Sequence, residues 1–262
     1  MRLLFIGDIV GEPGRRAIRL LVPRLRREWE LDWVIANGEN AAGGAGITAG
    51  TASELLANGV DVLTLGDHAW DYREVNALFG AEPRLLRPLN YPPGAPGRGA
   101  AVFQRSDGAS LGVVNVQGRV FMANLENPFN TIEPELDRLH QETPIVIVDM
   151  HAEATSEKIA LARMLDGRVS AVIGTHTHVQ TADEQIFPSG TAYLTDAGFT
   201  GPHESVIGRR IEPVIQRFKT NLPQRFDVAS GRVLLQGALL EIDLATGQTQ
   251  SIRRISEPLP AA

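Results

Sequence analysis

Leu3-Leu4-Phe5-Ile6-Gly7-Asp8 is a short apolar run that ends in a glycine and an aspartate. Runs of this length, rich in Val, Ile and Leu, are typical of strands buried on both faces of a sheet. The pattern recurs along the chain, at Leu3–Ile6, Trp33–Ala36, Val60–Leu65, Leu111–Val116, Ile145–Val148, Ala171–Ile173 and Ala192–Leu194. We therefore predict a sheet built from short buried strands.

Helix-like segments separate many of these runs. The first is predicted at Pro13–Glu30, where Pro13 suits the first turn because its missing N–H would have no partner there. Four more are predicted, at Thr51–Asn58, Tyr72–Phe79, Glu133–Gln141 and Thr155–Leu165. Strands that alternate with helices indicate an α/β fold with parallel portions. Two half-sheets packed together would fit this order.

Loops and one hairpin account for much of the remainder. Pro83–Gly99 is rich in Pro and Gly and is interpreted as a surface loop that crosses between the two halves. Val233–Leu244 and Gln248–Ile252 are predicted to pair as a hairpin around Thr246-Gly247. The last residues, Glu257–Ala262, are expected to be a frayed tail.

The composition is that of a globular protein. The 262 residues, 43% hydrophobic and 21% charged, are expected to form a single domain over residues 1–262. The net charge of −6 does not favour general attraction to nucleic acid or to anionic lipid. Six arginines between Arg15 and Arg27 are interpreted as the solvated face of a helix. A surface that guides an anionic substrate is the alternative.

Cysteine is absent, which excludes disulfides and thiolate metal sites and permits a reducing compartment. The apolar run at the N-terminus is too short for a signal peptide or a membrane span. We therefore expect a cytoplasmic protein without a membrane partner.

Five of the apolar runs stop at side chains that are able to bind a metal ion. The runs lead into Gly7-Asp8, Asn37-Gly38-Glu39-Asn40, Gly66-Asp67-His68, Asp149-Met150-His151 and Gly174-Thr175-His176-Thr177-His178. Sites in α/β sheets form outside the carboxyl ends of the strands, so these groups are expected to share one crevice. Imidazole combined with carboxylate suits Zn, Fe and Mn.

Each of these residues also has a plainer interpretation when taken alone. Asp8 would serve as a helix cap, Glu39 as a surface carboxylate, and His151 as a core histidine. His176 and His178 are harder to explain in that way, because residues two apart in extended chain point to the same side. The glycines that precede the ligands are expected to let the backbone turn sharply and to leave room for ions.

The two remaining histidines do not follow strands. His140 comes late in a predicted helix and is interpreted as a surface residue. The role of His203 is left open, and the site entrance is one position considered for it. The glycine-rich segment after Asp8 lacks the spacing of dinucleotide-binding and P-loop motifs. A G-x-S-x-G elbow is absent as well. The residues alone thus indicate a metal-dependent hydrolase.

The order of these blocks resembles the calcineurin-like metallophosphoesterases, whose blocks read D-x-H, G-D, G-N-H, H and G-H-x-H. Asp8-Ile9-Val10 lacks the histidine of the first block, and Glu39 stands where the bridging aspartate would be. These departures resemble the YmdB-like branch of bacterial 2′,3′-cyclic-nucleotide 2′-phosphodiesterases. Longer strings fit that branch closely, namely residues 35–41, 149–158 and 195–202.

The resemblance implies a four-layer α/β/β/α fold of two packed mixed β-sheets flanked by helices. It also implies a centre of two metal ions, Fe first and Mn or Zn as alternatives. One ion would be held by Asp8, Asn40 and His178, and the other by Asp67, His151 and His176. Glu39 would bridge the ions, and His68 would be the catalytic general acid. A metal-bridging hydroxide would attack the phosphorus of a small nucleotide or an RNA-end phosphodiester.

Four points stay open at the level of the sequence. Asp67 replaces the asparagine that the superfamily places before its catalytic histidine, which makes the centre one charge less positive. Alternative functions are an RNA-associated or regulatory binding protein with a weakly active site, and a phosphomonoesterase of the same superfamily. Substrate-binding residues are not identified. A homo-oligomer is left open, and Phe121 and Phe129 are assigned to core or loop packing rather than to an interface.

Overall fold

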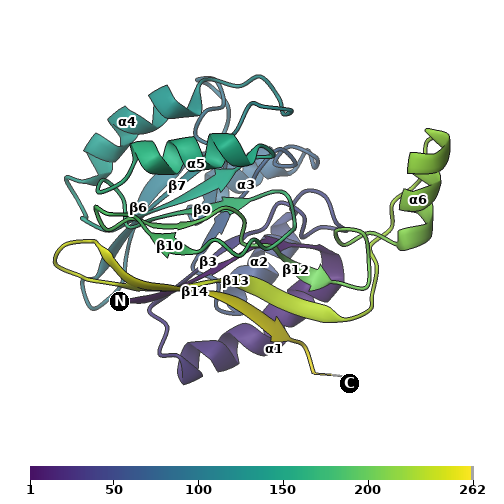
Figure 1. Ribbon diagram of the computed structural model, residues 1–262, viewed down its shortest axis with the longest axis horizontal. Helices are drawn as coiled ribbons and strands as arrows, with labels where there is room; N and C mark the ends of the chain where they lie inside the picture. The colour runs from purple at the N-terminus through teal and green to yellow at the C-terminus, as the bar shows by residue number, and fades with distance from the viewer. Residues whose placement is uncertain (261–262) are drawn as a thin grey trace.

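The computed structural model describes residues 1–260 and confirms an α/β fold with two packed sheets. The described part contains six helices: α1 (Gly11–Glu28), α2 (Ala49–Ala57), α3 (Val75–Ala81), α4 (Pro128–Leu139), α5 (Thr155–Met164) and α6 (Ile211–Thr220). The first five correspond to the predicted helices. The helix α6 was not predicted, and it extends away from the rest of the protein (Figure 1).

The strands form an eight-stranded and a six-stranded sheet. The first has the order β2 (Asp8–Ile9), β12 (Phe199–Pro202), β13 (Val233–Ile242), β1 (Arg2–Ile6), β3 (Trp33–Asn37), β4 (Val62–Thr64), β5 (Leu85–Leu86), with β14 (Thr249–Pro258) paired to β13. The second has the order β10 (Gln185–Ile186), β11 (Ala192–Leu194), β9 (Ala171–Thr175), β8 (Val146–His151), β7 (Ser110–Gln117), β6 (Ala100–Gln104). Four consecutive strands of each sheet are parallel, β1-β3-β4-β5 and β11-β9-β8-β7.

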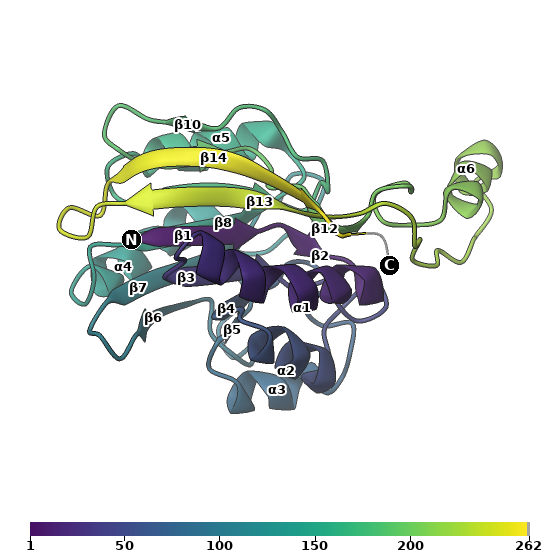
Figure 2. The same ribbon diagram turned by 90° about the horizontal axis from the view of Figure 1, so that it is seen from below.

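The two sheets and their helices make four layers, as the resemblance implied. The helices α1, α2 and α3 cover the outer face of the first sheet, and α4 and α5 cover that of the second (Figures 1 and 2). Side chains such as Phe5 and Ile35 from one sheet pack against Val113 and Ile147 from the other. Each face of both sheets is thereby buried along the parallel strands, which explains their continuous apolar runs.

The layer of side chains between the two sheets changes from apolar to polar along the strands. It is apolar at Val62 of β4 and at Ile147 of β8. Two residues further along, the same face carries Thr64 and Asp149, and β8 then ends in His151. All three polar side chains are fully buried. Because the parallel strands end at the same edge, this change of character places polar groups together there.

The predicted crossing between the two halves and the predicted hairpin are confirmed with altered boundaries, but residues 85–88 are buried and do not form a surface loop. Residues 83–99 include the short strand β5 and then cross to β6 in the second sheet. The hairpin is longer than predicted, because β14 continues to Pro258. The frayed tail is therefore a wrong prediction for residues 257–259: Glu257 and Pro258 pair with β13, and the Leu259 N–H donates to the Val233 carbonyl at 2.9 Å. Residues 261–262 lie outside the described residues.

The arginines of α1 do not form a free basic face. Four of the six form ion pairs, Arg15 and Arg19 with Glu54, Arg24 with Glu28, and Arg26 with Asp61. Phe129 is partly buried against the core, as predicted. Phe121 is 91% exposed, so the prediction that it packs in the core or a loop is wrong. Within residues 1–260, every helix is too short or too polar to cross a bilayer.

Candidate active site

Four side chains converge where β3, β4, β8 and β9 end, each with a ligand atom within 4.8 Å of those of the other three: Glu39, Asp67, His151 and His176. His151 Nε2 lies 3.2 Å from Glu39 Oε1 and 2.9 Å from Asp67 Oδ1. His176 Nδ1 lies 3.2 Å from Asp67 Oδ1. Carboxylate oxygens and imidazole nitrogens in one cluster fit a transition-metal ion.

Asp8, Asn40 and His178 form a second group beside the first. His178 Nε2 lies 3.6 Å from Asp8 Oδ1 and 3.3 Å from the side-chain nitrogen of Asn40. The same nitrogen lies 3.2 Å from Glu39 Oε1, so Glu39 contacts both groups. Asp8 Oδ1 is buried and has no hydrogen-bond partner among the described residues. A buried carboxylate oxygen without a partner fits a second cation at this position.

In both His151 and His178, Nδ1 contacts a hydrogen-bond partner within the protein, and Nε2 faces the carboxylates. His151 Nδ1 lies 2.9 Å from the Thr175 hydroxyl, and His178 Nδ1 lies 3.0 Å from the Ile207 carbonyl oxygen. The Thr175 hydroxyl donates to Asp149 Oδ1 at 2.6 Å, so it accepts from His151 Nδ1–H. These partners select the tautomer that leaves Nε2 free for a metal.

His176 has the opposite orientation. Its Nε2 lies 3.3 Å from Glu153 Oε2, and its Nδ1 faces Asp67. Neither Glu153 nor Thr175 is predicted from the sequence as a site residue. The one signal is their position, because Glu153 follows His151 by two residues and Thr175 directly precedes His176.

A buried polar network lies directly beneath the ligands. The Asp149 carboxylate accepts hydrogen bonds from the hydroxyls of Thr64 and Thr175 and from the Asn37 amide. Burial raises the pKa of Asp149 to about 6, although His151 and the two hydroxyl donors oppose the rise. The network connects β3, β4, β8 and β9 at the level where their ligands begin.

The carboxylates and histidines of the site shift one another's pKa values. Burial by itself raises the pKa of Asp8, but His178 and His151 lower it to about 2. Burial lowers the pKa of His151, yet Glu39 and Asp67 raise it well above its usual value of 6.5. Asp8 likewise raises the pKa of His178 against the effect of burial. The carboxylates and the imidazoles of His151 and His178 therefore each favour the charged form of the other.

His68 lies beside this cluster and not within it. Its Nδ1 lies 2.8 Å from Asp71 Oδ2, and its backbone N–H donates to Glu39 Oε2 at 3.0 Å. The side chain is 40% exposed and lines the neighbouring cavity. A half-exposed imidazole whose other nitrogen is held by a carboxylate is suited to proton transfer to a bound molecule.

The glycines before the candidate ligands, Gly7, Gly38, Gly66 and Gly174, leave room for side chains, and none of them adopts a positive φ angle. Gly38 and Gly66 each begin a turn, because their carbonyls accept from the Ala41 and Ala69 N–H groups at 3.1 and 3.2 Å. A Cβ on Gly66 would lie 2.1 Å from His151 Nε2 and 2.4 Å from Glu39 Oε2. The left-handed backbone occurs at two of the candidate ligands, with φ of 97° at His176 and 61° at His178.

The site opens into a cavity of about 430 Å³. Its lining includes ligands, His68 and Glu153, together with the apolar side chains of Val179 and Ile207 and the cation of Arg209. A cavity of this volume has the size of ordinary small-molecule sites. Polar and charged groups together with two apolar side chains suit a ligand that has both an anionic and an apolar part.

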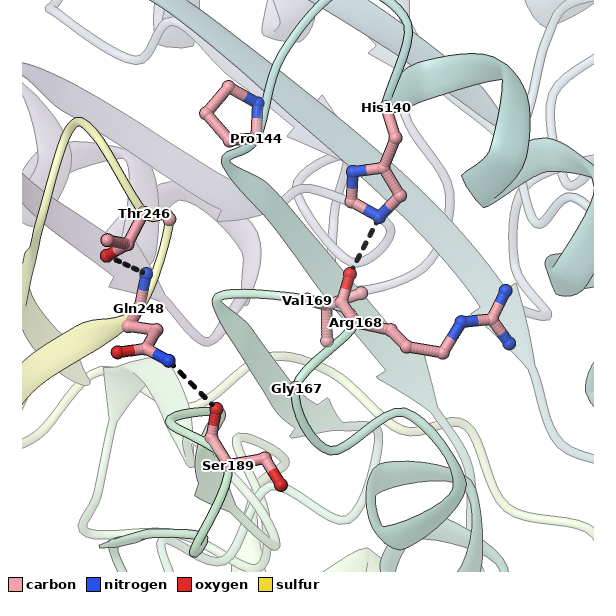
Figure 3. Close-up of a pocket in the computed structure, with 9 residues that line it drawn as sticks. His140, Pro144, Gly167, Arg168, Val169, Ser189, Thr246 and Gln248 are labelled. Atoms are coloured by element: carbon pink, nitrogen blue, oxygen red, sulfur yellow. Dashed lines mark hydrogen bonds between the residues drawn. The ribbon is translucent and has the colours of Figure 1, made fainter.

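A different cavity, of about 290 Å³, lies at the amino ends of β8, β9 and β11, and Figure 3 shows the residues that line it. Its polar groups bond to the protein itself: His140 Nε2 lies 2.8 Å from the Arg168 carbonyl oxygen, and Gln248 donates to the Ser189 carbonyl. His140 is exposed, as predicted for a surface residue. This cavity contains no cluster of reactive groups.

His203 lies outside the lining of the active-site cavity. The ring of Phe199 stacks between two imidazoles, with its centroid 5.3 Å from that of His178 and 4.1 Å from that of His203. His203 therefore supports the packing behind a ligand and does not form the entrance.

Comparison with known proteins identifies the family. The chain matches the family described as YmdB-like protein over residues 4–255. It belongs to the YmdB-like family. The 2′,3′-cyclic-nucleotide 2′-phosphodiesterase of Bacillus subtilis is 47% identical over 255 residues, which cover 97% of this chain and 96% of that relative. The predicted resemblance is thereby confirmed.

Two solved structures share the fold of this YmdB-like protein. A hypothetical protein from Thermus thermophilus is 46% identical, with a TM-score of 0.91 over 99% of this chain and 100% of that one. A structure described as a novel phosphatase from Mycoplasma pneumoniae is 32% identical, with a TM-score of 0.92 over 98% of this chain and 93% of that one. The four-layer fold is thus common to these proteins.

Proposed function

We propose that this YmdB-like protein is a metal-dependent phosphodiesterase that hydrolyses 2′,3′-cyclic nucleotides or related RNA-end phosphodiesters. The observation that carries the proposal is the convergence of four ligand side chains within 4.8 Å, beside a cavity that His68 lines. A relative matched over 97% of this chain bears the name of this activity. A metal-ligand set next to a nucleotide-sized cavity supports the same reaction class.

The two groups of side chains are assigned to two ions. Asp8, Asn40 and His178 would hold one ion, and Asp67, His151 and His176 the other. Glu39 would bridge them, because it contacts members of both groups. Iron is the proposed metal, and manganese and zinc suit the same ligands. Asp67 makes the centre one charge less positive than an asparagine would, which favours an ion of higher charge.

The residues around the centre have distinct roles in this proposal. When bound, two metal ions would supply a hydroxide from water near neutral pH and would neutralise charge on the phosphate oxygens. His68 is the general acid that protonates the departing sugar oxygen. Asp71 holds His68 Nδ1, which leaves Nε2 to donate the proton. The apolar side chains of Ile207 and Val179, which line the cavity, would face the nucleoside.

A phosphomonoesterase is the second candidate, because the similar structure from Mycoplasma pneumoniae is described as a phosphatase. An RNA-associated binding protein receives less support. The arginines of α1 that would form its docking face are largely engaged with carboxylates such as Glu54. A cytoplasmic location and a homo-oligomer stay predictions.

The proposal is tested by metal analysis of the purified protein and by turnover of three substrates. We expect two metal ions per chain, and faster hydrolysis of 2′,3′-cyclic AMP than of 3′,5′-cyclic AMP or 3′-AMP. Preferred hydrolysis of 3′-AMP would support the phosphomonoesterase instead. Glu39→Gln should lose metal, whereas Glu133→Gln on the exposed side of α4 is the matched control. An unchanged metal count in Glu39→Gln would contradict the bridging role.

A further inference from the structure

Lys158 and Asp196 form an ion pair in the protein interior behind the active site. Both side chains are 0% exposed, and Lys158 Nζ lies 2.8 Å from Asp196 Oδ2. Lys158 is on α5, which covers the second sheet (Figure 1). Asp196 comes two residues after β11. Neither residue lines the cavity or belongs to the ligand cluster. The proposed reaction therefore assigns them no role.

Both members of the pair contact the segment that carries the last two histidine ligands. Lys158 Nζ donates to the Thr175 carbonyl at 2.8 Å. Asp196 Oδ2 accepts from the Thr177 N–H at 3.1 Å and from the Thr177 hydroxyl at 2.8 Å. Thr175 and Thr177 are the two neighbours of His176. The pair thus holds the backbone on both sides of that ligand.

This segment has an unfavourable backbone that its surroundings must maintain. Both His176 and His178 have positive φ angles, 97° and 61°. Residues other than glycine rarely adopt this conformation and keep it only where neighbouring structure enforces it. Thr177 lies between the two histidines, so its hydrogen bonds to Asp196 act on the peptide groups next to both.

The carboxylate of Asp196 is itself fixed. Its Oδ1 accepts from the Gly198 N–H at 2.8 Å, while Oδ2 takes the three remaining donors. The packing is tight as well, because a Cβ on Gly174 would lie 1.8 Å from the Thr195 carbonyl oxygen and 2.9 Å from Lys158 Cδ. The pair therefore has one arrangement available to it.

Stability alone does not explain a buried ion pair. Replacing such a pair with apolar residues of similar volume is often neutral or stabilising, because desolvation of the charges offsets their attraction. Directed, charge-assisted hydrogen bonds instead provide defined geometry. Here that geometry is imposed on residues 175–178.

We propose that the Lys158–Asp196 ion pair positions the His176-Thr177-His178 ligands, holding residues 175–178 in the metal-binding conformation before any metal is present. Lys158 and Asp196 are positioning residues and touch neither metal nor substrate. The inference rests on the proposed function, because it takes His176 and His178 as metal ligands.

Two variants and one control test this inference. Lys158→Met/Asp196→Asn removes both charges together, so that no charge is buried alone. Thr177→Val removes the two hydrogen bonds of the Thr177 hydroxyl, to Asp196 and from the Val179 N–H, without changing charge. Arg163→Met is the control: it removes a cation from the same helix, where Arg163 lies over the Phe187 ring and not on the ligand segment. Three quantities are measured: the melting temperature and the amide hydrogen exchange at residue 177 of metal-free protein, and the affinity for Mn²⁺.

We expect both test variants to bind Mn²⁺ about 10–100-fold more weakly, the range found when groups that orient metal ligands are removed. Exchange at residue 177 should accelerate in metal-free protein, and Arg163→Met should match the parent in both respects. A lower melting temperature with unchanged exchange and unchanged Mn²⁺ affinity would overturn the inference, since the pair would then serve stability only. If the double variant does not fold, Thr177→Val decides by the same two readouts.

If the proposed function is wrong, the Mn²⁺ titration of the parent protein gives a different result. A parent protein that binds fewer than two Mn²⁺ ions would contradict the dinuclear centre. The exchange comparison would then still decide whether the pair orders residues 175–178.

Discussion

Asp149 and His151 are connected through one hydroxyl group, that of Thr175, which donates to Asp149 at 2.6 Å and lies 2.9 Å from His151 Nδ1. Because the hydroxyl has one proton and gives it to the carboxylate, it accepts from the imidazole. His151 is thereby held with Nε2 toward Glu39 and Asp67. The network beneath the site thus sets the tautomer of a proposed ligand.

Thr175→Val should weaken metal binding about 10–100-fold, because it removes the group that orients His151. Thr64→Val is a matched control, since Thr64 is also buried in a strand and also donates to Asp149, but does not contact His151. Both variants should lose similar stability, measured by denaturant unfolding of metal-free protein. Equal Mn²⁺ affinity in the two variants, measured by titration calorimetry, would count against an orienting role for Thr175.

Gly66→Ala should abolish metal binding, because the new Cβ would occupy the space between His151 and Glu39. Gly80→Ala is the control, since Gly80 lies in α3 with nothing within 4 Å of the position that its Cβ would take. That substitution should stabilise the protein by about 0.5–1 kcal/mol and leave the metal content unchanged. Elemental analysis and thermal unfolding check both results. Full metal content in Gly66→Ala would show that the cluster lies elsewhere.

His68→Ala should lower turnover of 2′,3′-cyclic AMP by about 10²–10⁴-fold, the usual contribution of a general acid, with metal content unchanged. A nitrophenyl phosphodiester should lose far less, because its leaving group departs without a proton. Asp71→Asn should give a smaller loss, since it removes only the partner of His68 Nδ1. Equal losses of kcat with both substrates would exclude His68 as the acid.

Metal binding should release protons. The pKa of His151 is raised well above 6.5 by Glu39 and Asp67, in spite of burial, so metal-free protein near neutral pH keeps a proton that a metal must displace. Affinity for Mn²⁺ should therefore rise with pH above 6.5. Calorimetry in buffers of different ionisation enthalpy measures the release. An affinity that does not vary with pH, without proton release, would contradict the assignment of His151 as a ligand.

The same shift determines how metal-free stability varies with pH. A histidine whose pKa is higher in the folded than in the unfolded state stabilises the fold fully below its unfolded pKa. That contribution is lost as pH rises through the folded-state value. For His151, the free energy of unfolding should therefore fall as pH increases above 6.5. Unfolding by urea across this range, without metal, follows the change.

The predicted ligands were recognisable in the sequence because parallel strands end at one edge. Asp8, Asp67 and His151 each follow a short apolar run, and that position alone predicts that they meet. Their supporting partners carry no such signal. Thr175 reaches Asp149 and His151 only because β8 and β9 pair in the register that sets His151 opposite Thr175.

Other features depend equally on long-range packing. Lys158 and Asp196 are 38 residues apart, and their pairing follows from the position of α5 over the second sheet. The helix α6 was not predicted, although Ile211, Val214, Ile215 and Phe218 have the spacing of an apolar helix face; the helix projects from the body and buries only Val214 of these. Glu153 lies in a turn, where a polar residue is ordinary.

The central claim is that two metal ions at this site carry out phosphodiester hydrolysis. Its most direct test is to remove the metal, return Mn²⁺ in measured equivalents, and follow hydrolysis of 2′,3′-cyclic AMP. The account predicts little activity up to one equivalent per chain, full activity at two, and nucleoside 3′-phosphate as the product. Full activity at one equivalent, or in metal-free protein, would contradict it.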